Sequence, residues 1–153
     1  MKTQDYIDAV GDYFGEPRVA TLLKHLGVDK KPKISRGERS TNFVCKPLGV
    51  EIAFTNESSL DVSNARYPDG ALVLSSVRFY GPGSEEFEQY SESLPHALSF
   101  EMGVADVSKR LGNPAFSNEF IGTYRWDLPR HCIFVDCEEG KKITQVCVQL
   151  PVA

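Results

Sequence analysis

Cysteines and histidines are the residues of this chain best suited to nucleophilic or metal chemistry, and it has only seven: Cys45, Cys132, Cys137, Cys147, His25, His96 and His131. The adjacent His131 and Cys132 suggest a base with its nucleophile, or two ligands of one metal ion. Neighbours on a strand point to opposite faces, however, so this pair cannot act together in place. Cys132 and Cys137 also differ in parity, and the short-spaced ligand pairs of a zinc site are missing. We therefore expect neither a metal site nor a cysteine nucleophile.

Phosphate and acid–base chemistry have weak candidates. Gly81-Pro82-Gly83 follows an expected strand, but it lacks the third glycine and the Lys-Ser/Thr pair of a phosphate loop, so we interpret it as a turn. The carboxylate pairs Glu85/Glu86 and Glu138/Glu139 lie in polar stretches, where such pairs are ordinarily solvated. The basic run Lys30–Arg39 can contact phosphates, yet no aromatic residues are interleaved with it, which favours a solvated loop. The sequence predicts no catalytic residues and no cofactor.

Length and composition limit the class of protein. The chain has 153 residues, of which 41% are hydrophobic and 25% charged, typical of one globular domain that buries its core without staples. The net charge of −4 argues against nucleic acid as the partner. No run approaches the ~20 apolar residues of a membrane span, and the polar N-terminus has no apolar signal core. We expect a cytoplasmic protein with no membrane partner and with reduced cysteines in its core.

The elements that would position these residues begin with two helices. Gln4–Phe14 carries apolar residues on one stripe and acidic residues opposite, and Pro17–Leu26 has Pro17 in its first turn and an apolar face. From Thr41 the apolar period changes to two, which predicts a hairpin that turns at Pro47-Leu48-Gly49. Residues 55–70 are expected to form a loop that closes on a Pro-Asp-Gly turn. Ala71–Tyr80 is then a further strand.

A second set of elements follows an acidic linker. A helix is expected over Val104–Leu111, since apolar residues recur at helical spacing up to Gly112-Asn113-Pro114. Three strands are expected over Tyr124–Leu128, His131–Cys137 and Ile143–Leu150. Apolar residues occupy both faces of the last of these strands, so we expect it to be central in its sheet.

The two sets of elements resemble each other. Val19–Gly27 and Val104–Gly112 are identical at five of nine positions, and the spacing Thr41-x5-Pro47 recurs as Thr123-x5-Pro129. We therefore predict an α+β fold of two tandem helix-plus-antiparallel-sheet units, with helices packed on one face of a twisted sheet. The first unit would span residues 1–83 and the second residues 98–153, with the acidic linker 84–97 between them, in one compact globule.

Aromatic and acidic residues form the candidate binding surface. Aromatic side chains rimmed by charge of one sign are typical of protein interfaces with electrostatic steering. The interpretation that the aromatics are simply core stays open for Tyr124 and Trp126. The partner-binding candidates are Glu85, Glu86, Glu88, Tyr90, Glu92, Tyr80, Tyr124 and Trp126.

Two segments resemble known families. Phe100–Val107, which leads to Leu111-Gly112-Asn113-Pro114, resembles the tandem α/β repeats of the β-lactamase inhibitor protein and of small outer-membrane assembly lipoproteins. That resemblance implies helices on an antiparallel sheet whose exposed side binds proteins, although this chain lacks their export signal and disulfide context. The stretch Phe79–Phe100, together with Leu111-Gly112-x-Pro114, is similar to small bacterial immunity proteins of polymorphic or contact-dependent growth inhibition toxin systems.

The second resemblance supplies the functional expectation. It implies a cytoplasmic immunity protein, not an enzyme, that neutralises one cognate toxin domain by occlusion. The toxin domain would be basic and a nuclease. The alternatives are a protein-binding module of another system, or a small enzyme or small-molecule-binding domain with a site between sheet and loops. Weak candidates for that last site are Cys132, His131 and Asp136.

Overall fold

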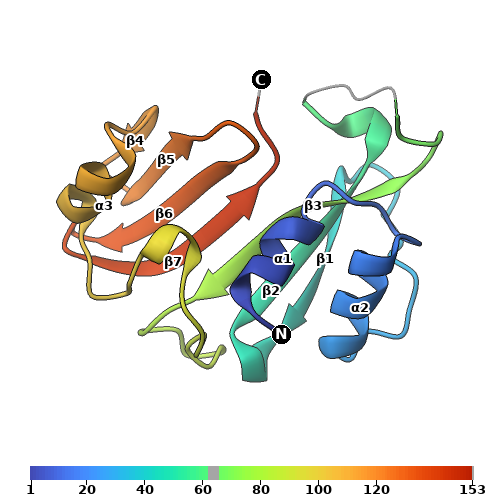
Figure 1. Ribbon diagram of the computed structural model, residues 1–153, viewed down its shortest axis with the longest axis horizontal. Coiled ribbons are helices and arrows are strands. Elements are labelled where there is room, and N and C mark those ends of the chain that lie inside the picture. The colour runs from blue at the N-terminus through green and yellow to red at the C-terminus, as the bar shows by residue number, and fades with distance from the viewer. Residues whose placement is uncertain (62–65, 153) are drawn as a thin grey trace.

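The computed structural model describes residues 1–61 and 66–152. Within these ranges, three α-helices and one seven-stranded antiparallel sheet form an α+β fold, as predicted (Figure 1). The helices are α1 (Thr3–Ala9), α2 (Pro17–His25) and α3 (Val104–Leu111). The strands are β1 (Ser40–Cys45), β2 (Val50–Asn56), β3 (Leu72–Tyr80), β4 (Phe116–Asn118), β5 (Thr123–Asp127), β6 (Cys132–Glu138) and β7 (Lys142–Gln149).

Strands from both halves of the chain belong to one sheet. The strand order is β1-β2-β3-β7-β6-β5-β4, so β3 and β7 pair at the middle and join the two halves. β7 lies between β3 and β6, which confirms the prediction that the last strand is central. Residues 62–65 of the expected loop over 55–70 lie outside the described ranges.

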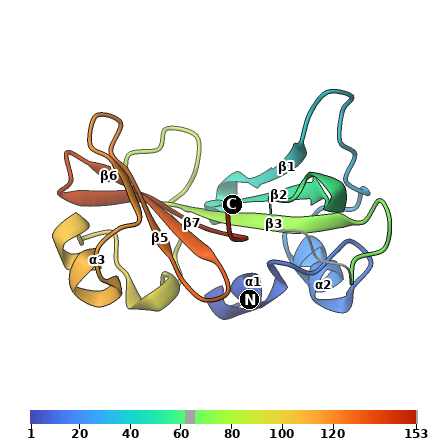
Figure 2. The same cartoon turned by 90° about the horizontal axis from the view of Figure 1, so that it is seen from above.

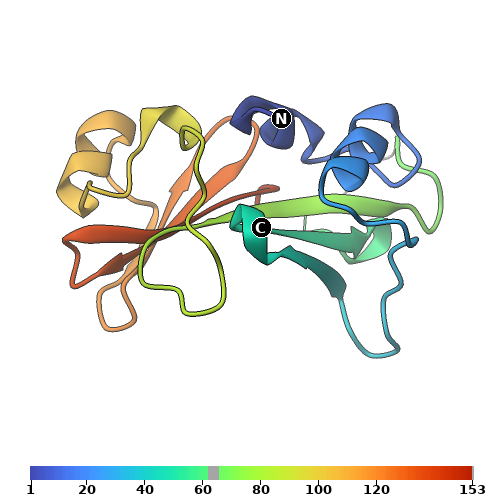
Figure 3. The same ribbon diagram turned by 90° about the horizontal axis from the view of Figure 1, so that it is seen from below.

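The helices cover one face of this sheet and leave the other open (Figures 2 and 3). Ile52, Phe79, Val146 and Ile133 point toward the helices from four strands and are fully buried. Tyr6 of α1 packs edge-on against Phe79, with ring centroids 5.7 Å apart. Alternation with a period of two therefore gives each strand an apolar side under the helices and a more polar side on the open face.

Two of the expected helices form close to the predicted positions. Pro17 is the first residue of α2, where its missing N–H costs no helical hydrogen bond. At the start of α3, the Gly103 N–H donates to the Asp106 carboxylate at 3.0 Å, which satisfies one of the unpaired donors of a helix N-terminus. The starts of these two helices are therefore determined by residues close to them in the sequence.

The prediction of a helix over Gln4–Phe14 is wrong in its second half. α1 ends at Ala9, and the following residues pair with β3 instead. The Gly11 N–H donates to the Leu74 carbonyl and the Phe14 N–H to the Leu72 carbonyl, both at 2.8 Å. This part of β3 extends beyond its ladder with β7, so its backbone groups are available to residues 11–14. A long-range pairing thus replaces the last helical turn.

The short strand β4 was not predicted, whereas the buried state of three of the cysteines was. β4 was missed because three residues at a sheet edge carry too little periodicity to be distinguished from a loop. Cys132, Cys137 and Cys147 are buried free thiols, as expected of core cysteines, and Cys45 is half-buried. None of the described helices has the length and apolarity needed to cross a membrane.

Candidate functional site

Three of the four aromatic residues predicted to anchor a partner belong to the core. Tyr90, Tyr124 and Trp126 are at most 6% exposed. On β5, positions 124 and 126 alternate toward the helical side, in register with Val135 and Ile133. The expectation that these three rings form an exposed surface is therefore wrong, and for Tyr124 and Trp126 the alternative of simple core packing is correct.

Tyr80 is the predicted aromatic residue that lies on the open face. Its side chain is half-buried and stacks on Phe87, with ring planes 10° apart and centroids separated by 3.8 Å. The Tyr80 hydroxyl donates to the Glu51 carboxylate at 2.6 Å. Burial, and then this bond to a carboxylate, raise the pKa of Tyr80 above its usual value, so the hydroxyl stays protonated as a donor.

The predicted acidic residues divide between the two sides of the sheet. Glu85, Glu86 and Glu88 are exposed in the loop over residues 81–89, which projects on the open side (Figure 3). Glu92 is exposed too, but by then the chain has returned to the helical side, where Tyr90 packs against Tyr6 of α1. The structure thus brings three of the four acidic residues together.

An apolar loop tip completes the open side and was missed from the sequence. Phe120 is 98% exposed and Ile121 63% exposed, in the tight turn between β4 and β5. The turn is held by the Gly122 N–H, which donates to the Asn118 carbonyl at 2.8 Å. The sequence does carry a signal, because two large apolar residues lie between Asn118-Glu119 and Gly122. These flanking residues are typical of a turn, and side chains in a turn cannot reach the core.

The loop tip and the acidic loop flank a hollow on the open face. This cavity of about 500 Å³ is lined by Tyr80, Ser84, Ile121, Asp136 and Gln145, among others. Two of its polar lining residues, Gln145 and Asp136, are paired within the sheet. The Arg78 guanidinium donates to Gln145 at 2.8 Å, and the Thr123 hydroxyl donates to Asp136 at 2.9 Å. The open face therefore has a polar surface held in place by hydrogen bonds. It lies between the acidic loop over residues 81–89 and the apolar loop tip of Phe120 and Ile121.

The weak enzyme candidates do not converge. Cys132 and Asp136 are engaged on the open face, where the Cys132 thiol donates to Asp127 at 3.2 Å. Burial raises the pKa of the Cys132 thiol, so the thiolate needed for nucleophilic attack is disfavoured. His131 precedes β6, and its ring contacts His96. Sequence reasoning missed His96, because no local signal relates two residues that are 35 positions apart.

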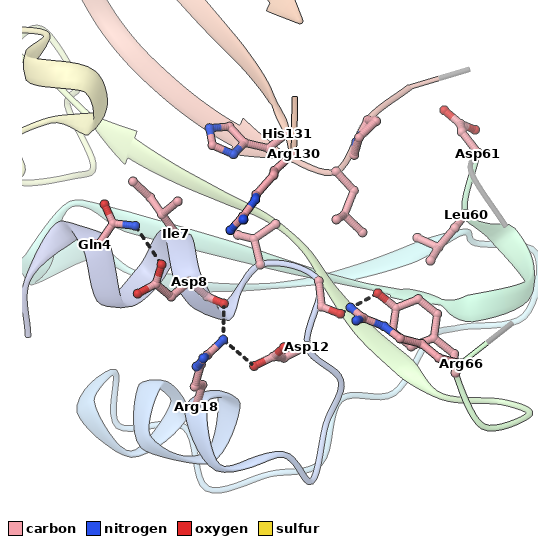
Figure 4. A pocket seen from close by; sticks show the side chains of 15 residues that line it. Gln4, Ile7, Asp8, Asp12, Arg18, Leu60, Asp61, Arg66, Arg130 and His131 are labelled. Carbon is pink, nitrogen blue, oxygen red and sulfur yellow. Dashed lines mark hydrogen bonds and ion pairs between the residues drawn. The ribbon is translucent and has the colours of Figure 1, made fainter. Parts of the chain in front are cut away.

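A second cavity, of about 700 Å³, lies on the helical side between α1 and the β5–β6 turn (Figure 4). Arg18 bridges two of its acidic residues: it donates to the Asp8 carbonyl at 3.2 Å and lies 3.8 Å from the Asp12 carboxylate. Arg130 and His131 line the other side. Charges of both signs in one cavity are suited to polar groups of a ligand.

Asp12 is expected to reduce stability at neutral pH. Burial, and then Glu16, raise the pKa of its carboxyl group, and Arg18 offsets this in part. A folded-state pKa above the unfolded value means that ionisation at pH 7 costs stability, which protonation restores as the pH falls. Asp12→Asn should therefore melt above wild type at pH 7, and the difference should narrow in acid. Thermal melts across this pH range, with exposed Asp8→Asn as control, test it. A lower melting temperature for Asp12→Asn at pH 7 would contradict it.

Comparisons with known proteins add one distant structural likeness. No protein-family model matches the chain, and no curated protein matches it. The fold is similar to the crystal structure of a DUF4309 family protein (YjgB) from Bacillus subtilis, with 12% sequence identity and a TM-score of 0.45. The likeness covers 86% of this chain and 77% of that one.

Proposed function

We propose that the protein is an immunity protein that binds a toxin domain through the open face of its sheet and neutralises it by occlusion. The observation that carries this proposal is the pairing of a helix-free sheet face with exposed apolar residues at its rim, Phe120 and Ile121. Apolar side chains of this size are unfavourable in water, and covering them with a partner removes that free-energy cost. A toxin active site held against this face would be closed to its substrate.

The shape of the open side supports protein docking. Loops over residues 29–39, 81–89 and 119–122 project beyond the sheet on the side opposite the helices (Figures 2 and 3). They would enclose a partner on three sides, with the hollow beside Tyr80 as the floor. Interfaces of this kind combine a few large anchors with a polar rim.

The charge of the loop over residues 81–89 supports a partner that is basic where it faces this loop, whereas the loop over 29–39, at the other end of the open side, is itself basic. Glu85, Glu86 and Glu88 are exposed, and the ion pair that involves one of them, Lys46–Glu86 at 3.9 Å, is itself solvated. Carboxylates in this position would speed the encounter with a basic surface and do little for the affinity once the complex has formed. A nuclease domain that binds polyanionic nucleic acid would present such a surface.

We further infer that the fold consists of two tandem units. β1-β2-β3 and β5-β6-β7 are two antiparallel meanders that meet through the β3–β7 pair. α2 precedes the first meander, and α3 precedes the second. This order supports a duplication, in agreement with the repeat between Val19–Gly27 and Val104–Gly112.

Capture followed by a growth assay tests the proposal. The tagged protein should retain a small basic domain from a lysate of its own organism. That domain should arrest growth when expressed alone, and co-expression of the wild-type protein should restore growth. The double variant Phe120→Asp/Ile121→Asp should lose both capture and rescue, because it places charge on the apolar rim. Ala20→Asp/Thr21→Asp, on the exposed side of α2, adds the same two negative charges on the helical face and should retain both.

Two results would contradict the proposal in different ways. A captured domain that does not harm growth would leave protein binding in place and exclude immunity. Full rescue by Phe120→Asp/Ile121→Asp would exclude the open face as the docking surface. Circular dichroism of both double variants distinguishes these results from misfolding. Both pairs of positions are exposed, so neither variant is expected to unfold.

A further inference from the structure

Two imidazole rings from distant parts of the chain meet at the rim of the helical-side cavity. His96 belongs to the short 3-10 turn Pro95–Ala97, and His131 stands just before β6. Their Nε2 atoms are 3.2 Å apart, and their ring planes are inclined by 42°. Buried Pro95 and Leu98 flank the first histidine and fix its position. The Leu128 N–H, which donates to the His131 carbonyl at 2.9 Å, fixes the second.

The separation of the two nitrogens matches that of two metal ligands. Imidazole nitrogens bind zinc at ~2.0–2.1 Å, so two of them in a tetrahedral site lie roughly 3.3 Å from each other. An N–H···N hydrogen bond spans a similar distance. In that case one ring carries its proton on Nε2, whereas a metal ion requires both Nε2 atoms unprotonated. The two arrangements therefore differ by one proton and can be told apart experimentally.

The backbone at His96 is held in an unfavourable conformation. His96 and Ala97 both have positive φ, 55° and 57°, in the left-handed region that residues with a Cβ rarely enter. Consecutive left-handed residues persist only where surrounding contacts impose them, and such outliers concentrate at ligand-binding positions. Here the conformation carries the His96 ring to His131.

Access favours metal binding, which requires the neutral form of each imidazole. His96 is exposed, and His131 lines the cavity (Figure 4), so further coordination positions would face solvent rather than core.

We propose that His96 and His131 form a two-histidine site for a divalent transition-metal ion, with zinc as the probe and water in the remaining positions. Among the described residues, no group of three or more His, Cys, Asp or Glu side chains is placed to hold a metal. The site therefore supplies two protein ligands and binds more weakly than a structural zinc centre. Imidazole ligands suit zinc, copper and nickel, whereas magnesium and calcium prefer oxygen ligands.

Calorimetric titration of the untagged protein with Zn²⁺ tests the site. Wild type should bind one ion per chain, and so should His25→Gln, which alters the remaining histidine, an exposed residue of α2. His96→Gln and His131→Gln should each lose roughly tenfold or more in affinity, because each removes one of two ligands. Zinc binding by wild type that either variant leaves unchanged would overturn the proposal, and so would the absence of binding by wild type.

A measurement on wild type alone tests the site without variants that could misfold. In nitrogen-15 NMR spectra of the imidazole rings, zinc should shift the Nε2 resonances of His96 and His131 together and leave His25 in place. Shifts confined to one ring, or shared by all three, would identify adventitious binding and overturn the proposal.

Discussion

Trp126→Ala is expected to lower the free energy of unfolding by about 3–5 kcal/mol, the usual cost of removing a large aromatic side chain from a core. Trp126 is 1% exposed, and its indole N–H donates to the Gly112 carbonyl at 2.8 Å. The substitution leaves a cavity beneath the sheet and leaves that carbonyl without its donor. For a chain of this length the melting temperature should fall by roughly 6–20 °C.

Urea titration followed by circular dichroism measures this effect, because Trp126 is the only tryptophan and its fluorescence is lost with it. The midpoint should move while the slope of the transition stays constant. Trp126→Phe retains most of the ring packing and removes the N–H donor, so it should lose less. Phe120→Ala, at a side chain 98% exposed, should change stability by less than about 0.5 kcal/mol. If Trp126→Ala were as stable as this control, Trp126 would not be part of the core.

Local patterns predicted the elements that depend on local physics. α3 forms over the predicted residues because its apolar face and the Gly112 stop lie within two turns of helix. The turn at Pro47-Leu48-Gly49 forms because one residue in it can adopt a positive φ, 69° at Gly49. The run Val146-Cys147-Val148 predicted the central position of β7, although the open face of this strand also carries Gln145 and Gln149.

Long-range contacts determine what the sequence did not reveal. The second half of the expected first helix is lost to pairing with β3, a contact between residues some 60 positions apart. Alternation along β5 places Tyr124 and Trp126 on the same side of the sheet. Whether that side is the covered one depends on where α3 packs. The open-face surface depends on three loops that the sheet order brings to one side. His96 and His131 meet only in the tertiary structure, so the sequence around each residue does not predict their contact.

Gly49→Ala is the second substitution with a large expected effect, because it would separate the acidic loop from the sheet. A Cβ at Gly49 would overlap the Glu88 carbonyl and lie 2.7 Å from the Tyr90 nitrogen, and both are backbone atoms that cannot rotate away. The left-handed φ adds its own strain. Relief requires residues 88–90 to move, which breaks the bonds from Glu88 N–H to Lys46 and from Tyr90 N–H to Tyr80. We expect a loss of about 3 kcal/mol or more, in the range of disrupted cores and strained backbones.

Gly27→Ala separates the clash from the strain. Gly27 has a similar φ of 73°, and nothing lies within 4 Å of an added Cβ, so only the strain of about 1–2 kcal/mol applies. The excess loss in Gly49→Ala over Gly27→Ala then measures the docking of the acidic loop on the β1–β2 turn. Hydrogen exchange should show weaker protection of the Glu88 and Tyr90 amides in Gly49→Ala only. Equal losses in the two variants would mean that the loop is not held by this contact, and that the position of the acidic residues on the open face is not fixed by the sheet.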